Sequence, residues 1–177
     1  MDRRYFERTT MNRRSMFTFS AIATLGLALL PSSIVAQQGT LKQQLVGTWT
    51  LVGFEFIAAN GTKEQLANPK GILMFDAGGR YAFVAARGDR PKYKIADQPT
   101  AEEIVAATED FFAANFGTWS VNEADKTLTR HYDAALRPNN DGQDFKSSVS
   151  LMGDELRLTG QTLPGGFRID TVHRRAR

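Results

Sequence analysis

The pattern of apolar and polar positions in residues 45–175 predicts a series of short β-strands. Residues 45–57, with the sequence LVGTWTLVGFEFI, form a β-branched and aromatic run of strand length and are the first of them. Strict alternation places Trp49 and Leu51 on one face, and the other face carries Val46, Val52, Phe54 and Phe56. Because both faces are apolar, we expect both to be covered.

Seven further strands follow from apolar–polar alternation between turn signals. The clearest is a hairpin in which residues 71–76 and 80–86 flank an Ala-Gly-Gly turn. The other five are residues 116–121, 126–135, 143–152, 155–160 and 167–175. Eight antiparallel strands in a meander close a barrel whose interior is either filled or has room for one small ligand. The predicted fold is therefore mostly β, an up-and-down eight-stranded barrel.

The connections are predicted to be polar, with one exception. Residues 37–44 form a polar lead-in, and residues 63–70 form a polar connection. The exception follows Pro99, where Thr100 and Glu103 have the spacing of a helix capping box. Apolar residues then recur at helical spacing to about residue 115, which predicts one amphipathic helix packed outside the barrel against the first strand.

Residues 1–36 have the pattern of an export signal. Arg13-Arg14-Ser15 precedes an apolar run over residues 16–30, and a small-residue stretch ends at Ala36. A membrane anchor normally needs about 20 apolar residues. We therefore expect cleavage after Ala36, which leaves residues 37–177 as one periplasmic or secreted domain without membrane attachment.

Two details of the leader stay open. The arginine pair resembles the twin-arginine export signal, although paired arginines also occur in ordinary leaders. Met11 is an alternative start to Met1.

The basic charge of the chain belongs to the leader. The chain has 22 basic and 19 acidic residues, and residues 1–36 hold five arginines against Asp2 and Glu7, so residues 37–177 are electrically balanced. A nucleic-acid-binding domain needs a clustered basic face, so nucleic acid is excluded as a partner. The absence of cysteine excludes disulfides, thiolate metal sites and cysteine nucleophiles.

The densest group of titratable side chains is Arg130-His131-Tyr132-Asp133. On a strand, Arg130 and Tyr132 share one face, and His131 and Asp133 share the other. His131 has the chemistry of a general base and Asp133 that of the carboxylate that orients it. The competing interpretation is a solvent-facing polar row, and the sequence leaves open which face points inward.

Glu55 is a second candidate for the interior. Under strict alternation it shares a face with Trp49, so it points inward if the indole does. A buried carboxylate needs a partner, and Arg130 or Tyr132 are candidates. The alternative is a salt bridge at the rim.

No metal ion or cofactor is expected. His131 and His173 are the chain's two histidines, and they lack any ligand spacing typical of a metal or haem site. The chain has no Gly-x-Ser-x-Gly, no phosphate-binding loop and no dinucleotide fingerprint.

Taken together, these stretches resemble the bacterial lipocalin-like domain family, a calycin-type β-barrel. The matching stretches are residues 45–49 with 54–55, 71–81, 99–103, 116–121, 127–133, 138–139 with 142, and 153–156. The resemblance implies a closed or nearly closed barrel, and the lipocalin relatives typically hold small hydrophobic molecules. Gly47-x-Trp49 looks like the lipocalin Gly-x-Trp start, in which the indole plugs the closed end and stacks on a cation of the last strand, here Arg174 or Arg175.

Two positions depart from the family pattern. The family often has histidine where this chain has Arg130, and it often has arginine where this chain has Ser147. If these residues form a polar feature of the pocket, this chain has a changed one.

The leading hypothesis is an exported barrel that binds a small hydrophobic molecule in its interior. The candidate lining residues are Trp49, Glu55, Tyr81, Phe83, Trp119 and Tyr132. A second hypothesis is an isomerase or cyclase that moves a proton with His131 and Asp133, or with Glu55 and Arg130. A third is a filled barrel whose outer surface mediates interactions. The identity of the ligand and the oligomeric state stay open.

Overall fold

The computed structural model describes residues 39–177, and the predicted export signal lies outside them. The described part contains two α-helices, nine strands and a short 3-10 helix. In chain order these are α1 (Leu41–Leu45), β1 (Gly47–Ile57), β2 (Lys63–Gln65), β3 (Lys70–Phe75), β4 (Arg80–Ala86), α2 (Ala101–Glu109), β5 (Ala113–Asn122), β6 (Thr127–Ala135), η1 (Pro138–Asn140), β7 (Asp144–Met152), β8 (Glu155–Gly160) and β9 (Arg168–Arg175).

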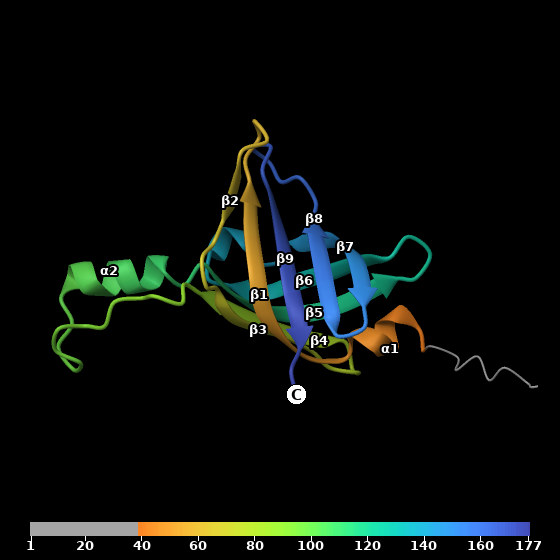
Figure 1. The fold of residues 1–177 in the computed structure, drawn as a ribbon, viewed down its shortest axis with the longest axis horizontal. Coiled ribbons are helices and arrows are strands. Elements are labelled where there is room, and N and C mark those ends of the chain that lie inside the picture. The colour runs from red at the N-terminus through yellow and green to blue at the C-terminus, as the bar shows by residue number, and fades with distance from the viewer. Residues whose placement is uncertain (1–38) are drawn as a thin grey trace, which may run out of the picture. The chain divides into compact units, whose positions relative to one another are not determined.

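Eight of the strands form an antiparallel sheet that closes on itself. Consecutive strands pair from β3 to β9, β1 pairs with β3, and β9 returns to pair with β1 (Figure 1). The closing register runs from Trp49 opposite Arg175 to Ile57 opposite Arg168. Closure leaves no open barrel edge for another chain to pair with. The predicted up-and-down eight-stranded barrel is confirmed.

Three short elements were not predicted from the sequence: β2, α1 and the 3-10 helix η1. β2 lies within the expected polar connection and pairs with the second half of β1, beyond the residues that pair with β3. Its three side chains are exposed, so no apolar pattern reveals it. α1 replaces the expected polar lead-in, and it begins with a capping box between Thr40 and Gln43.

A β-bulge at Val52 changes the alternation of β1. The register with β9 shifts between Leu51 and Gly53, and Val52 is 44% exposed. Phe54 therefore joins Trp49 and Leu51 on the inner face. Glu55 lies on the outer face, 3.4 Å from Lys63 Nζ. The expectation that Glu55 shares a face with Trp49 is wrong because strict alternation fails at the bulge.

Trp49 closes one end of the barrel. Its side chain is fully buried, and its Nε1 donates a hydrogen bond to the Leu45 carbonyl at 2.8 Å. The Arg175 guanidinium lies 4.1 Å from the centroid of the indole ring. Arg175 also donates to the carbonyls of Gln44 and Val46, at 2.6 and 3.2 Å. The predicted plug is confirmed, and Arg175 is its cation.

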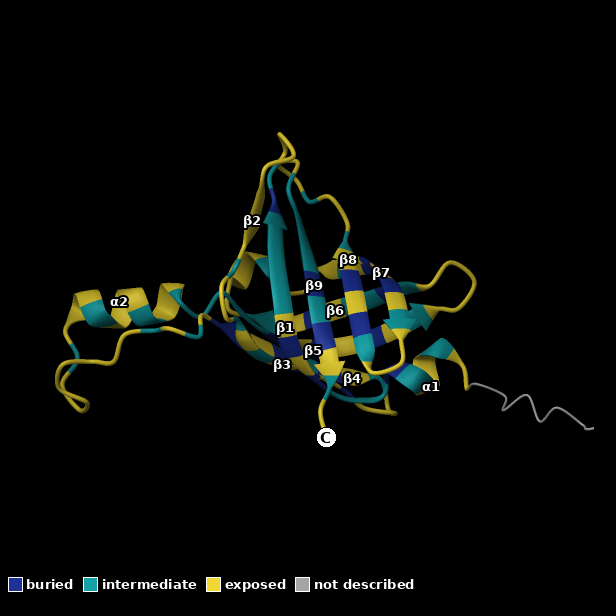
Figure 2. Cartoon of the chain, in the orientation of Figure 1, coloured by how far each residue is buried: buried dark blue, intermediate teal, exposed yellow. Residues whose placement is uncertain are grey.

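Helix α2 lies outside the barrel wall and has its predicted capping box, with Thr100 and Glu103 each accepting a hydrogen bond from the other's backbone N–H. It ends at Glu109 instead of about residue 115, because β5 begins at Ala113. None of its side chains is buried (Figure 2). The contact with the first strand comes from Phe112, after the helix, whose ring lies 4.5 Å from Phe54. Neither helix in residues 39–177 has the length and apolar character needed to cross a membrane.

Replacing Trp49 with alanine should lower the free energy of unfolding by about 3–5 kcal/mol, because it removes a fully buried indole and leaves a cavity. Urea denaturation measures this change. Met152→Ala is the control, since Met152 is 74% exposed and its truncation should leave stability near that of the wild type. Equal stability of the two variants would contradict the role of Trp49 as the plug.

Candidate functional site

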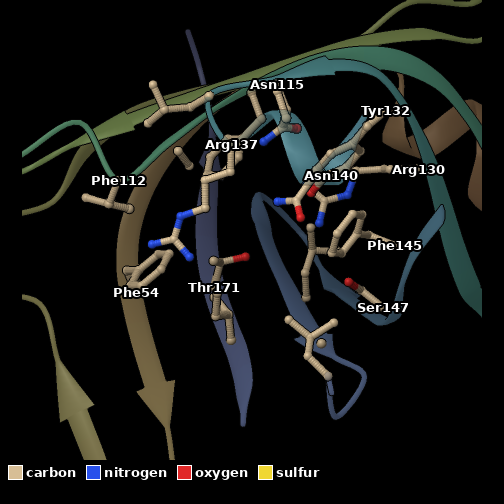
Figure 3. Close-up of a pocket in the computed structure, with 18 of the residues that line it drawn as sticks. Phe54, Phe112, Asn115, Arg130, Tyr132, Arg137, Asn140, Phe145, Ser147 and Thr171 are labelled. Atoms are coloured by element: carbon tan, nitrogen blue, oxygen red, sulfur yellow. The ribbon is translucent and has the colours of Figure 1, made fainter. Parts of the chain in front are cut away.

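The barrel encloses a cavity of about 550 Å³ between the plugged end and the opposite mouth (Figure 3). Six of the chain's 12 phenylalanines line it. They are Phe54, Phe56, Phe83, Phe112, Phe145 and Phe167. Cavities of about 300–1,000 Å³ with mostly apolar walls and a few polar groups are typical of small-molecule sites.

The strand registers define the depth of this cavity. His173 pairs with Leu51, and Arg130 is one inward position from the fully buried Leu128, so both lie next to the packed layer. Phe112 and Arg137 lie just outside the strands at the other end. The deep part is therefore the one that carries Arg130 and His173, and the mouth is formed by the loops before β5 and after β6.

Several polar atoms in the interior have no partner among the described residues. These are Arg130 Nε, His173 Nδ1, Asn115 Oδ1 and the Tyr81 hydroxyl. His173 is 1% exposed, and its other ring nitrogen, Nε2, lies 3.0 Å from the Thr171 hydroxyl. Buried polar groups are normally hydrogen-bonded. Arg130, His173 and Asn115 line the cavity, so their unpaired atoms are available to a ligand, whereas Tyr81 lies in the packed layer beneath it.

Burial favours the uncharged form of two of these groups. It lowers the pKa of His173 to about 3, and the nearby positive charge of Arg130 acts in the same direction. Burial also raises the pKa of the Tyr81 phenol. At neutral pH, His173 is therefore a neutral imidazole and Tyr81 a neutral phenol.

Arg130 carries the charge at the deep end of the cavity. Its Cζ lies 5.8 Å from the Tyr81 ring centroid and 5.9 Å from that of Tyr132. Aromatic faces attract a cation without neutralising it. In residues 39–177 no carboxylate lies within 4.0 Å of this guanidinium. Its charge is thus uncompensated within the described fold.

The proposed acid–base pair of His131 and Asp133 lies on the outer surface. His131 Nδ1 lies 2.8 Å from Asp144, and Asp133 lies 2.8 Å from Arg80. Each residue therefore has a different partner, and neither lines the cavity. The structure therefore does not pair His131 with Asp133, and both side chains face solvent, as in the competing interpretation of a solvent-facing polar row.

The predicted lining residues are distributed over three places. Phe83, Tyr132 and the catalytic candidate Arg130 line the cavity. Trp49, Tyr81 and Trp119 are buried in the packed layer beneath it. Trp119, for example, donates a hydrogen bond to the Asp76 carbonyl at 3.1 Å and packs on Phe75. Glu55 lies on the outer wall.

Other lining residues were missed by the sequence analysis. Phe54 and Phe56 were assigned to the face opposite Trp49, although Gly53 is a signal for a bulge because glycine inside a strand often marks one. His173 was considered only as a metal ligand. Both departures from the family pattern, Arg130 and Ser147, line the cavity.

Residues 39–177 contain no group of three or more histidine, aspartate or glutamate side chains arranged to hold a metal ion.

Comparison with known proteins gives a match to one family. The sequence model of a family described as a lipocalin-like domain matches residues 46–171. A comparison with the curated proteins gives no match.

Similar solved structures include three with low sequence identity. A lipocalin-like protein from Bacteroides uniformis ATCC 8492 is 16% identical, with 75% of this chain and 98% of that chain covered and a TM-score of 0.39. An uncharacterized protein from Bacteroides eggerthii DSM 20697 is 14% identical, with coverage of 75% and 99% and a TM-score of 0.39. A mutant of the fluorescent protein UnaG is 12% identical, with coverage of 76% and 97% and a TM-score of 0.35. The family assignment depends on the sequence match over residues 46–171.

The buried imidazole predicts how stability depends on pH. The unfolded chain protonates His173 near the ordinary histidine pKa of 6.5, whereas the folded chain does so at about 3. Between these values the unfolded state binds more protons, so His173 makes the free energy of unfolding fall by about 1.4 kcal/mol for each pH unit of acidification.

Urea denaturation of wild type, His173→Gln and His131→Gln at several pH values between about 7 and about 4 measures this contribution. His173→Gln should have a shallower pH dependence than the wild type. His131→Gln, which removes the exposed histidine, should keep the steep pH dependence of the wild type. Parallel curves for His173→Gln and wild type would contradict the burial of a neutral imidazole.

Proposed function

Because this chain belongs to the lipocalin-like domain family, we propose that it is an exported protein that binds a small hydrophobic molecule inside its barrel. The observation that supports the proposal is the cavity of about 550 Å³ with six phenylalanines in its wall. Apolar ligand surface buried there contributes about 25 cal/mol per Å² removed from water. The wall is held by the closed sheet, so little ordering of the protein opposes binding.

The two alternatives have less support. A filled barrel with a purely external role does not account for the cavity. Acid–base catalysis lacks its candidate base, since His131 and Glu55 both lie on the outer wall. The imidazole that does border the cavity, His173, has its pKa lowered to about 3 and is too weak a base for efficient proton abstraction at neutral pH.

A matched pair of substitutions on β6 tests the location of the ligand. Ala135 pairs with Asn115 and lines the cavity, whereas Ala134 pairs with Phe116, which is 49% exposed on the outer wall. Ala135→Trp should fill the cavity and weaken binding of the uncharged fluorophore N-phenyl-1-naphthylamine by about tenfold or more. Ala134→Trp should leave binding near the wild-type value.

Equal effects of the two tryptophans, or no fluorophore binding by the wild type, would contradict an internal ligand site. Native mass spectrometry of protein purified from its own host then provides an independent check. We expect a co-purified small molecule that is retained by Ala134→Trp and lost from Ala135→Trp.

Export is the part of the proposal that depends on the leader. Its support is the sequence pattern of residues 1–36, with a charged start, an apolar run and a small residue at Ala36. Sequencing the N-terminus of the protein from its host should give a chain that begins at Gln37. Replacing Arg13 and Arg14 with lysine should block export if the twin-arginine route is used, and cell fractionation measures this. A full-length chain in the cytoplasm of the host would contradict export.

A further inference from the structure

Resting on the proposed function, we propose that the ligand is an amphipathic carboxylate, whose anionic head lies against Arg130 at the deep end of the cavity and whose apolar body lies among the phenylalanines. Three observations on the cavity carry this inference. They are the sign of the lining charges, the lack of a partner for Arg130, and the neutral polar groups beside it.

The charged residues that border the cavity are all basic. They are Arg130, Arg137 and Lys146, and no aspartate or glutamate is among the lining residues. Lys146 alternates with the inward Phe145 and Ser147, so its side chain points to the outer face. Residues 37–177 as a whole are electrically balanced, so this one-sided lining is not a consequence of composition. A concave site with charge of one sign and low-dielectric walls favours a ligand of the opposite sign.

Arg130 differs from arginines on the outer wall. Arg80 lies 2.8 Å from Asp133, Arg157 lies 2.7 Å from Glu155, and Arg168 lies 3.3 Å from Asp170. Arg130 has no such carboxylate within the described residues; its Nε is buried without a hydrogen bond, as is that of Arg168, so the missing carboxylate is what distinguishes it. The Arg130 side chain is half-buried. A charge that is partly withdrawn from water is stabilised by a partner of opposite sign, and a ligand carboxylate would supply one.

The neutral groups near Arg130 favour a carboxylate over a phosphate. Ser147 is buried and pairs with Leu128, one inward position from Arg130, and its hydroxyl is a neutral hydrogen-bond donor. One guanidinium matches a carboxylate through two parallel N–H···O bonds. The other two basic side chains, Arg137 and Lys146, are exposed, so the deep end offers one positive charge to a head group. A phosphate monoester would bring up to two negative charges to that single cation.

Displacement of N-phenyl-1-naphthylamine from the full chain tests the inference with three probes that share one alkyl chain. The probes are dodecanoate, dodecan-1-ol and dodecyl phosphate. Dodecanoate should bind about tenfold or more tightly than the alcohol, because a hydrogen bond to a charged group discriminates by that factor. Dodecyl phosphate should bind no more tightly than dodecanoate.

Variants then assign the preference to Arg130. Arg130→Met, which keeps the length of the side chain without the charge, should weaken dodecanoate binding by about 10- to 100-fold and leave the alcohol within about threefold of the wild type. Arg80→Met, which removes an outer-wall guanidinium, should leave both affinities unchanged. Arg130→Lys should retain part of the preference, because it keeps the charge and loses the bidentate geometry.

Each failure has a different meaning. Equal affinities for dodecanoate and dodecan-1-ol in the wild type would overturn the inference and leave hydrophobic binding in place. Tighter binding of dodecyl phosphate would overturn the assignment to a carboxylate. If no probe and no fluorophore binds, the proposed function itself is wrong. If Arg130→Met does not fold, two measurements test the inference: the affinities of Arg130→Lys, and the ratio of the dodecanoate and dodecan-1-ol affinities of the wild type.

Discussion

The extra residue at Val52 is the constraint on which the cavity depends. Below it, β1 presents Trp49 and Leu51 to the packed core, and above it the same strand presents Phe54 and Phe56 to the cavity. Without the bulge, continued alternation would direct Glu55 inward and both rings outward. One inserted residue thus allows a single strand to place Trp49 in the closed end of the barrel and Phe54 and Phe56 in the cavity wall.

The barrel wall separates two electrostatic environments. Outside, opposite charges are paired across and along the strands, as with Arg80 and Asp133, and such exposed pairs contribute little to stability. Inside, Arg130 is placed among aromatic rings and neutral polar groups without a carboxylate in the described residues. A fold that needed Arg130 only for stability would be expected to pair it, and this difference is the basis for proposing that a ligand carboxylate pairs it.

Much of the architecture follows from local patterns in the sequence, and the site follows from interactions between distant strands. Alternation and turn residues predict the eight barrel strands, and Gly47-x-Trp49 with a basic last strand predicts the plug that Arg175 completes. The bulge, β2 and the inward position of His173 depend on how β1 pairs with strands far along the chain. Apolar–polar alternation cannot show which face of β6 points inward. The assignment of Arg130 to the cavity and of His131 to the outer surface depends on how β6 pairs in the closed barrel.

The register that closes the barrel also has a consequence for how the chain acquires its structure. Trp49 meets Arg175 across more than a hundred intervening residues, whereas the neighbouring hairpins form between nearby segments. Bringing such remote segments together has a large entropic cost, which makes this step slow relative to local hairpins. Until it occurs, the meander has two unpaired margins, the apolar β1 and the more polar β9. An unpaired strand edge can pair with another copy of the chain. The chain is therefore most prone to association with another copy in the interval before β1 and β9 pair.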